Sequence, residues 1–146
     1  MFESFFPKPK LFFGSLVLWI IFLITVWYSI GETLGNSLGF SLDTEEQVIG
    51  LGHFITSEFL WFDLFYLFGT LIFYYSWRRY HPHFWQNWSI LGSALLIYLS
   101  YASVQVSVII NAWYGPFYND IQTALGGTGE ITVSKLYSHF IIFCTI

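Results

Sequence analysis

The sequence predicts an all-α membrane protein, a polytopic bundle of helices. Of its 146 residues, 55% are apolar and only 10% are charged, with a mean hydropathy of +0.60. An ordinary soluble domain carries about 25% charged residues. A chain of this size cannot bury so much apolar surface and still present a polar exterior. Its apolar runs are also long enough to cross a bilayer as helices, so composition and run length favour the same class.

Composition also excludes several kinds of function. The formal net charge of −4 argues against binding to nucleic acid, whose phosphates attract basic surfaces. The single cysteine, Cys144, excludes an internal disulfide and a multi-cysteine metal site. The four histidines lack the helical spacing of metal ligands, and the glycines at 126–129 lack the Lys-Ser/Thr of a phosphate loop. We therefore expect neither an enzyme nor a cofactor-binding or metal-binding protein.

The first span is expected at residues 11–30. This run has no charge and no proline, contains thirteen Leu, Ile, Val or Phe residues, and covers about 30 Å as a helix. A cleaved signal peptide is the alternative interpretation. Its apolar region would be shorter and followed by an A-x-A-like site, which residues 33–37 match poorly. A membrane anchor is the better interpretation.

Residues 31–57 are rich in glycine and acid and are expected to form a polar loop with a short surface helix around 44–48. The second span follows at 59–77. It contains Asp63, about 6 Å from its start by helix rise. Intramembrane carboxylates are costly and often functional, so Asp63 is a candidate for proton uptake, the alternative being a hydrated or paired group near the interface. Glu58 is a second candidate, or simply a solvated helix cap.

The third span is expected at residues 90–110, and one of its faces is polar. The small polar residues of this face fall within about 80° of one another at 100° per residue. They are Ser93, Ser100, Ser103, Ser107 and Asn111. Such a face is either a helix–helix contact or the lining of a cavity. Gln105 points elsewhere and needs a second partner, so this span should be packed on two sides.

A fourth span starts at about residues 133–146 and is too short to cross a bilayer within this sequence. We therefore expect a fragment truncated within its fourth span. Orientation follows from the basic residues, of which Lys8, Lys10, Arg78 and Arg79 flank the same side of the first two spans. The positive-inside rule places that side, with the N-terminus, in the cytoplasm. The loop at 31–58 and the segment 111–135 then face outward.

Two stretches, His83-Phe-Trp-Gln-Asn-Trp-Ser-Ile-Leu-Gly and Asn111-Ala-Trp-Tyr-Gly-Pro-Phe-Tyr-Asn-Asp-Ile-Gln, resemble the SbmA/BacA family of bacterial inner-membrane peptide transporters. The opening Met1-Phe-Glu-Ser-Phe-Phe-Pro-Lys-Pro is also similar, and the resemblance covers nearly the whole chain as the first third of a family member. The motif residues are Trp85, Gln86, Trp88, Asn111, Trp113, Tyr114, Pro116, Phe117, Tyr118 and Gln122.

The resemblance implies a homodimer in the bacterial inner membrane, with a fold like the transmembrane domain of ABC exporters but without a nucleotide-binding domain. It implies import of peptide antibiotics and related peptides, driven by the proton gradient. Glu58 matches an acidic family position. This sequence departs from the family at Gln105, where a glutamate is familiar, at Asp120, where the acid is shifted by one place, and at Asp63, which replaces an uncharged residue.

Two other interpretations remain. A looser version of the second motif occurs in membrane domains of ATP-driven lipid or peptide exporters, and a nucleotide-binding motif downstream would favour that class. Alternatively, three spans and a stub form an inactive truncated membrane protein. For the importer, the acidic residues of the outward loop would attract cationic peptides. They are Glu32, Asp43, Glu45 and Glu46.

Overall fold

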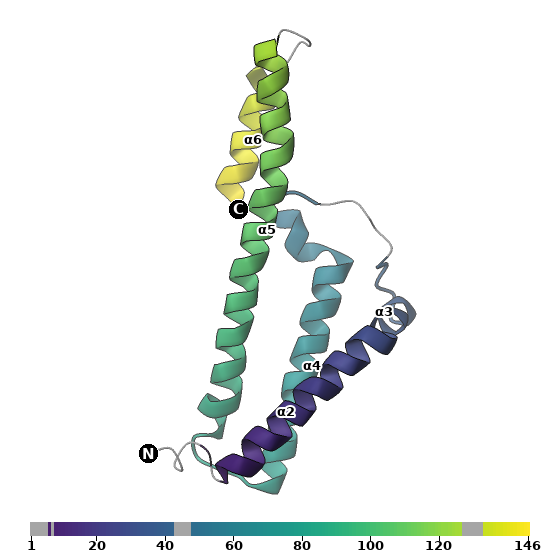
Figure 1. Ribbon diagram of the computed structural model, residues 1–146, viewed down its shortest axis with the longest axis vertical. Helices are drawn as coiled ribbons and strands as arrows, with labels where there is room; N and C mark the ends of the chain where they lie inside the picture. The colour runs from purple at the N-terminus through teal and green to yellow at the C-terminus, as the bar shows by residue number, and fades with distance from the viewer. Residues whose placement is uncertain (1–5, 7, 43–47, 127–132) are drawn as a thin grey trace.

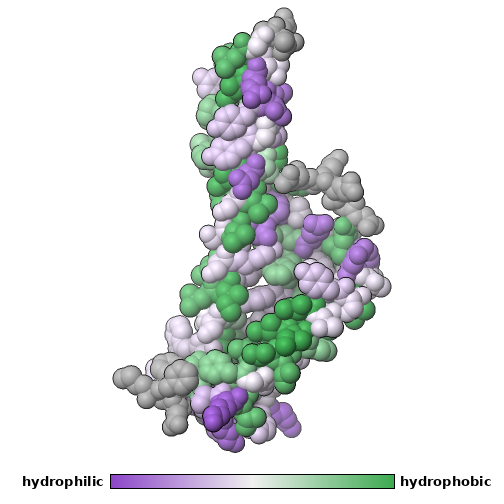
Figure 2. Space-filling model, viewed as in Figure 1, coloured by the Kyte–Doolittle hydropathy of each residue, from purple (hydrophilic) through white to green (hydrophobic). Residues whose placement is uncertain are grey.

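The structure, a computed structural model, describes residues 6, 8–42, 48–126 and 133–146, and within these ranges it contains helices and no strands (Figure 1). Three of the helical segments, Pro9–Ser37, Ser57–Tyr80 and Asn87–Gly126, are long and apolar enough to cross a membrane. Hydrophobic residues cover much of the outward face of the first segment, and hydrophilic residues gather at the lower end of the molecule (Figure 2). The all-α class expected from composition is thereby confirmed.

The first segment is longer than the span we expected. It consists of α2 (Pro9–Val26), a π-helical turn η1 (Trp27–Gly31) and α3 (Glu32–Ser37). The helix therefore continues past Ile30 into the segment expected to be loop. Packing explains this, because a Cβ added to Gly35 would lie only 3.1 Å from Trp61 Nε1, so the helix is pressed against its neighbour there. It ends at Ser37, and the chain turns at Gly39, whose φ of +94° a residue with a side chain rarely adopts.

The second segment, α4 (Ser57–Tyr80), follows a short 3₁₀ turn η2 (Leu51–Ile55). Thr56 caps its start, since the Thr56 hydroxyl accepts a hydrogen bond from the backbone N–H of Phe59 at 3.4 Å. Its last turn carries Arg78 and Arg79, where positive charge complements the helix dipole. α4 thus ends in the basic connection that the sequence placed between the second and third spans.

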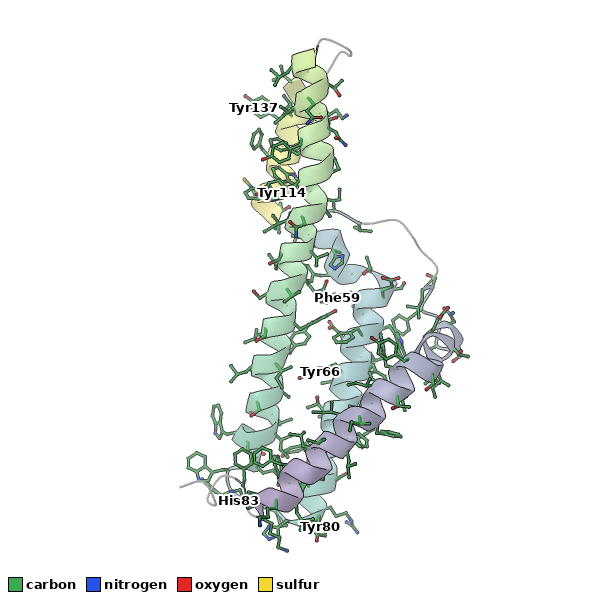
Figure 3. The ribbon with its side chains drawn as sticks, viewed as in Figure 1. Phe59, Tyr66, Tyr80, His83, Tyr114 and Tyr137 are labelled. Atoms are coloured by element: carbon green, nitrogen blue, oxygen red, sulfur yellow. The ribbon has the colours of Figure 1, made fainter. Side chains whose placement is uncertain are left out.

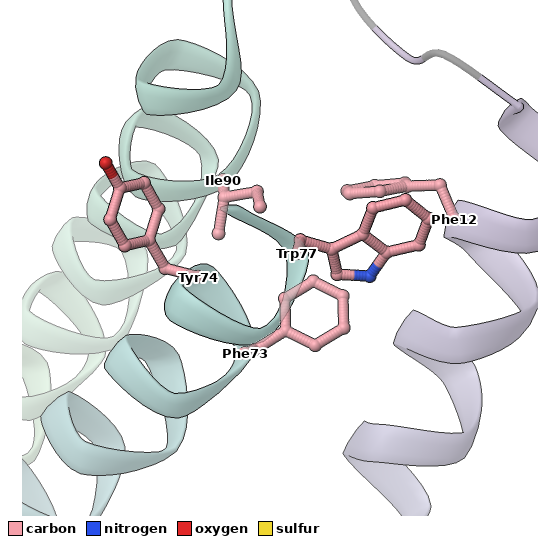
Figure 4. Close-up of a cluster of buried hydrophobic side chains, with 5 residues drawn as sticks. All are labelled: Phe12, Phe73, Tyr74, Trp77 and Ile90. Carbon is pink, nitrogen blue, oxygen red and sulfur yellow. The ribbon is translucent and has the colours of Figure 1, made fainter. Parts of the chain in front are cut away.

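α2 and α4 pack antiparallel through aromatic side chains. At one end lies a buried cluster formed by Phe12, Phe73, Tyr74, Trp77 and Ile90 (Figure 4). Farther along, the Trp19 indole N–H donates to the Gly69 carbonyl at 3.1 Å, and at the far end the Trp61 indole donates to the Gly31 carbonyl, also at 3.1 Å. These long-range contacts join the two helices over most of their length.

The third segment combines a π-helical turn η3 (Asn87–Gly92) with α5 (Ser93–Gly126). Together they form a 40-residue helix, about 60 Å long and about twice the hydrocarbon thickness. The helix does not stop near Ile110, as the sequence suggested, but continues through Pro116. α6 (Val133–Thr145) packs beside this upper half (Figure 1), and that packing offsets the hydrogen bond that proline cannot make.

The upper hairpin of α5 and α6 is held by Trp113. Its indole N–H donates to the His139 carbonyl at 2.9 Å, and its ring stacks on Phe117 and contacts Phe143, with centroids 4.5 and 4.8 Å away. Trp113 is buried within the chain. The side chain therefore fixes the register of α6 against α5.

The basic residues expected to share one side lie at one end of the bundle. The Lys8 ammonium sits 5.8 Å from the centre of the Tyr80 ring, and the Arg78 guanidinium donates to the Tyr74 hydroxyl at 2.6 Å. Lys8 precedes α2 and Arg78 ends α4, so the antiparallel pair brings the two basic segments together. This geometry agrees with the shared compartment on which the topology depends.

Candidate functional site

A row of polar and aromatic side chains fills the contact between α4 and α5, and we call it the α4–α5 seam. Its residues recur every three or four positions on each helix, the spacing of a single helix face. Phe59 and Tyr66 lie between the two helices (Figure 3). The seam comprises Phe59, Phe62, Asp63 and Tyr66 of α4 and Ala94, Tyr98, Tyr101 and Gln105 of α5.

Asp63 occupies the middle of the seam. Its Oδ2 accepts a hydrogen bond from the Tyr98 hydroxyl at 3.0 Å. Its Oδ1 is buried and has no hydrogen-bond partner in the part of the chain that the structure describes. A buried acceptor without a donor costs about 1–3 kcal/mol, and more when it is charged. The α4–α5 contact therefore holds a carboxyl oxygen that no donor among the described residues satisfies.

Tyr66 lies one helical turn from Asp63, but its hydroxyl is hydrogen-bonded to a different group. Its hydroxyl donates to the backbone carbonyl of Ala94 at 2.8 Å, which ties α4 to the start of α5. Its ring packs against Phe62 and Tyr98, with centroids 6.3 and 5.9 Å away. Tyr66 therefore holds the helices together and leaves Tyr98 as the donor to Asp63.

The seam continues towards η2 through Tyr101 and Gln105. Tyr101 stacks on Phe59 and lies against Phe62, with ring centroids 6.0 and 4.4 Å apart. Its hydroxyl interacts electrostatically with Asp63 and is hydrogen-bonded to Gln105. The Gln105 carbonyl oxygen in turn accepts a hydrogen bond from His53 Nε2 of η2 at 3.0 Å. The second partner that Gln105 required is therefore His53.

The opposite end of the seam is rich in aromatic rings. The cluster of Phe12, Phe73, Tyr74, Trp77 and Ile90 closes the space between α2, α4 and η3 there. The Gln86 amide, also buried, donates to the Tyr74 carbonyl at 3.1 Å and so fixes the corner between α4 and η3. One end of the seam thus leads to Gln105 and His53, and the other leads to packed rings, among which the Tyr74 hydroxyl donates to Asn87 at 2.7 Å.

Among the candidates for the proton and substrate pathway, only Asp63 lies in the seam. Glu58 is exposed in the first turn of α4. The small polar face of α5 is exposed too, and the Ser100 and Ser107 hydroxyls donate to carbonyls of their own helix at 3.0 and 3.1 Å. Within the described residues, α5 therefore meets α4 through its tyrosines and not through its serines. The exposed positions are Ser93, Ser100, Ser103, Ser107 and Asn111.

The sequence reasoning missed Tyr98, Tyr101 and His53. The signal for the two tyrosines was their spacing with Ala94 and Gln105, at intervals of four, three and four residues. No spacing connects His53 with this face, because a turn brings it back onto α5. The α4–α5 seam is therefore lined by phenol, amide and imidazole groups, and a role for the serine face of α5 stays a prediction.

A second polar cluster joins α5 to α6, about 15 Å along the helix beyond residue 110 and thus outside the expected hydrocarbon span. Lys135 Nζ lies 2.8 Å from Asp120 Oδ1, and the His139 Nε2–H donates to Asp120 Oδ2, also at 2.8 Å. The hydrogen bond from Lys135, and after it that from His139, lowers the pKa of the Asp120 carboxyl. This cluster fastens the hairpin beyond Trp113.

The motif residues divide between two roles. Gln86, Trp113 and Phe117 pack within the chain. Tyr114 and Tyr118 stack on each other along an exposed face, with ring centroids 5.7 Å apart. The other motif positions, also exposed, are Trp85, Trp88, Asn111, Pro116 and Gln122.

One comparison bears on the family that the sequence resembles. Residues 82–146 match the model of the SbmA/BacA-like family. This confirms the resemblance over the range that contains both motifs, and it supports membership in the SbmA/BacA-like family, whose members are transporters.

The matched range runs from the corner after α4 through η3, α5 and α6, so it includes Tyr98, Tyr101 and Gln105 of the seam. α2 and α4, with Asp63, lie outside the match. The three apolar helices favour a multi-pass membrane protein, and the matched residues resemble the SbmA/BacA-like family over less than half of the chain.

Proposed function

We propose that this chain belongs to a proton-driven importer of peptide antibiotics and related peptides in the bacterial inner membrane. In this proposal the chain works within a homodimer whose fold resembles the transmembrane domain of ABC exporters, and its N-terminus is cytoplasmic. Peptide and proton cross together, and no cofactor takes part. The part assigned to the described residues is proton binding.

The observation that carries the proposal is the half-satisfied carboxylate of Asp63. One oxygen is held by Tyr98 at 3.0 Å, and the other is buried without a partner. When ionised, this group places a charge with an unmet acceptor between two helices that must pack closely. When protonated, it becomes a neutral donor that α5 can accommodate. Proton binding therefore changes the stability of the α4–α5 contact, which is what coupling to transport requires.

The outward loop supports a preference for cationic cargo. Glu32 is exposed at the end of the bundle opposite the basic residues. The other acids of this loop, Asp43, Glu45 and Glu46, lie outside the described residues. An acidic face raises the local concentration of cationic peptides and does so most strongly at low salt. Reversing the charges of the four loop acids is expected to lower uptake of a cationic peptide at low salt.

The test uses the complete transporter in liposomes with an imposed pH gradient. Asp63→Asn removes the titratable group but keeps the shape and an oxygen acceptor for Tyr98. We expect it to abolish the part of cationic-peptide uptake that depends on the gradient while peptide binding persists. Glu58→Gln, which neutralises an exposed acid one and a half helical turns away, is the matched control and should retain gradient-driven uptake. Gradient-driven uptake by Asp63→Asn at the rate of the unmodified protein would contradict the proposal.

A further inference from the structure

We propose that the basic end of the α2–α4 pair binds an anionic phospholipid, with one acyl chain in a groove between the two helices and the phosphate beside Lys8. This site lies on a surface outside the α4–α5 seam and is independent of proton binding by Asp63. Three features of the surface support it: an apolar groove, polar atoms that already have partners within the protein, and positive charge at the mouth of the groove.

The groove lies between the start of α2 and the end of α4. It has a volume of about 250 Å³ and is lined by Leu11, Ser15, Ser76, Trp77 and Tyr80. Leu11, Ser76 and Tyr80 are exposed, so the groove is open along its side. A flexible hydrocarbon chain can therefore enter it from the surrounding bilayer.

The polar groups of the groove wall already have partners within the protein. Ser15 Oγ donates to the Phe12 carbonyl at 2.8 Å and accepts the Trp77 indole N–H at 3.0 Å. The Ser76 hydroxyl donates to the Ile72 carbonyl at 2.7 Å. A polar ligand would lose its hydrogen bonds to water in this groove without replacing them, which is unfavourable. A hydrocarbon chain has no such bonds to lose, so the groove favours an acyl chain.

Positive charge lies at the mouth of the groove. The Lys8 ammonium is 5.8 Å from the centre of the Tyr80 ring, which forms part of the groove wall. Tyr80 lies at the lower end of the bundle (Figure 3), and Lys8 is exposed beside it. Lys10, Arg78 and Arg79 belong to the same end. A chain that leaves the groove here therefore meets a cation, and an anionic headgroup is attracted to it.

The acids of the described ranges lie elsewhere. Glu32 belongs to α3, Glu58 and Asp63 to the first two turns of α4, and Asp120 to the upper part of α5. Hydrophilic residues gather at the lower end of the molecule, and hydrophobic residues cover the outward face of α2 above it (Figure 2). Tyrosine and lysine side chains favour such a boundary between hydrocarbon and headgroups. The ligand that fits an apolar groove ending in cations at this boundary is an anionic phospholipid.

The first experiment counts the phospholipids that the complete protein keeps. The protein is extracted with mild detergent from vesicles of phosphatidylglycerol and phosphatidylcholine in equal amounts, and retained lipid is measured by native mass spectrometry. The unmodified protein should retain phosphatidylglycerol in preference to phosphatidylcholine. Lys8→Gln is expected to lower that preference about fivefold, the contribution of one cation near an anionic lipid, and Lys8→Arg should keep it.

Lys10→Gln is the matched control, because it removes the same charge two positions along the chain. It should retain most of the preference for phosphatidylglycerol. Equal losses in Lys8→Gln and Lys10→Gln would show a general attraction of the basic end for anionic lipid, and they would overturn the assigned position of the phosphate.

A second pair of variants tests the groove and leaves the charges in place. Ser76→Phe puts a ring into the groove at an exposed position and should remove the retained phosphatidylglycerol. Ser29→Phe is the same change at an exposed serine of η1, whose hydroxyl also donates within its own helix, to the Thr25 carbonyl, and the lipid should stay. Normal retention by Ser76→Phe would contradict the groove as the site. If the unmodified protein shows no preference for phosphatidylglycerol, another part of the complete protein or a second copy covers the groove, and the lipid assignment fails.

Discussion

Close packing between α2 and α4 at Gly69 can be tested by adding a single methyl group. A Cβ built on Gly69 lies 2.8 Å from Leu23 Cδ1, closer than real Cβ atoms come to a neighbour, and 3.2 Å from Leu23 Cδ2, which is a tight contact. The Gly69 carbonyl also accepts the Trp19 indole hydrogen bond at 3.1 Å, so this point of contact is anchored. Gly69→Ala must therefore displace either the Leu23 side chain or the whole of α2.

The expected magnitude follows from a matched variant. Gly14→Ala makes the same change inside α2, where nothing lies within 4 Å of the added Cβ. Both variants gain about 1 kcal/mol of helix propensity, so that gain cancels in the difference between them. Inserting a methyl group into a packed contact costs about 1–3 kcal/mol. Gly69→Ala should therefore be about 1–3 kcal/mol less stable than Gly14→Ala.

The assay is the apparent free energy of unfolding, measured by titrating the complete protein from mild detergent into SDS while following tryptophan fluorescence. Leu23→Ala provides a second check, because it removes the atoms that meet the new methyl group. The double variant Gly69→Ala/Leu23→Ala should lose less stability than the sum of the two single variants. Equal stability of Gly69→Ala and Gly14→Ala, together with additive effects in the double variant, would refute the close α2–α4 contact.

Three further predictions concern the seam, the hairpin and the topology. Tyr98→Phe removes the hydrogen bond that α5 donates to Asp63, so the pH profile of gradient-driven uptake should change. An unchanged profile would contradict this role. Lys135 and His139 of α6 lower the pKa of the Asp120 carboxyl. The stability that these two contacts contribute is therefore present above the ordinary pKa of the carboxyl, and it is lost as the pH falls through the lowered pKa. Asp120→Asn should therefore speed hydrogen exchange in α6 at neutral pH, and unchanged exchange would argue against the cluster. In a background without the native cysteine, a membrane-impermeant thiol reagent added outside intact cells should label a cysteine at Leu51 but not one at Phe84, and the reverse pattern would invert the topology.

The apolar runs were sufficient to predict three membrane helices and the all-α class, because helix formation in a bilayer depends mainly on length and hydropathy. Asp63 could also be singled out, since a carboxylate inside an apolar run is conspicuous. The need of Gln105 for a partner followed from its angular position on the helix. Each of these features depends on the residues of a single segment, so the sequence alone is enough to predict it.

The contacts that give Asp63 its surroundings could not be predicted in the same way. α4 is apolar and aromatic around most of its circumference, so periodicity does not reveal which of its aromatic residues meet α5. The continuation of α5 through Pro116 depends on packing against α6, through Trp113 and Phe117, and local propensity argued against it. His53 reaches Gln105 only because the turn η2 folds back, a tertiary arrangement that no spacing within the sequence expresses.

Infrared difference spectroscopy of the complete transporter measures the protonation of Asp63 itself. Lowering the pH across the working range should produce a carbonyl stretching band of a protonated carboxylic acid, and the band should be missing in Asp63→Asn and shifted in Tyr98→Phe. A spectrum without such a band, or a band that persists in Asp63→Asn, would show that the proton is bound at another group.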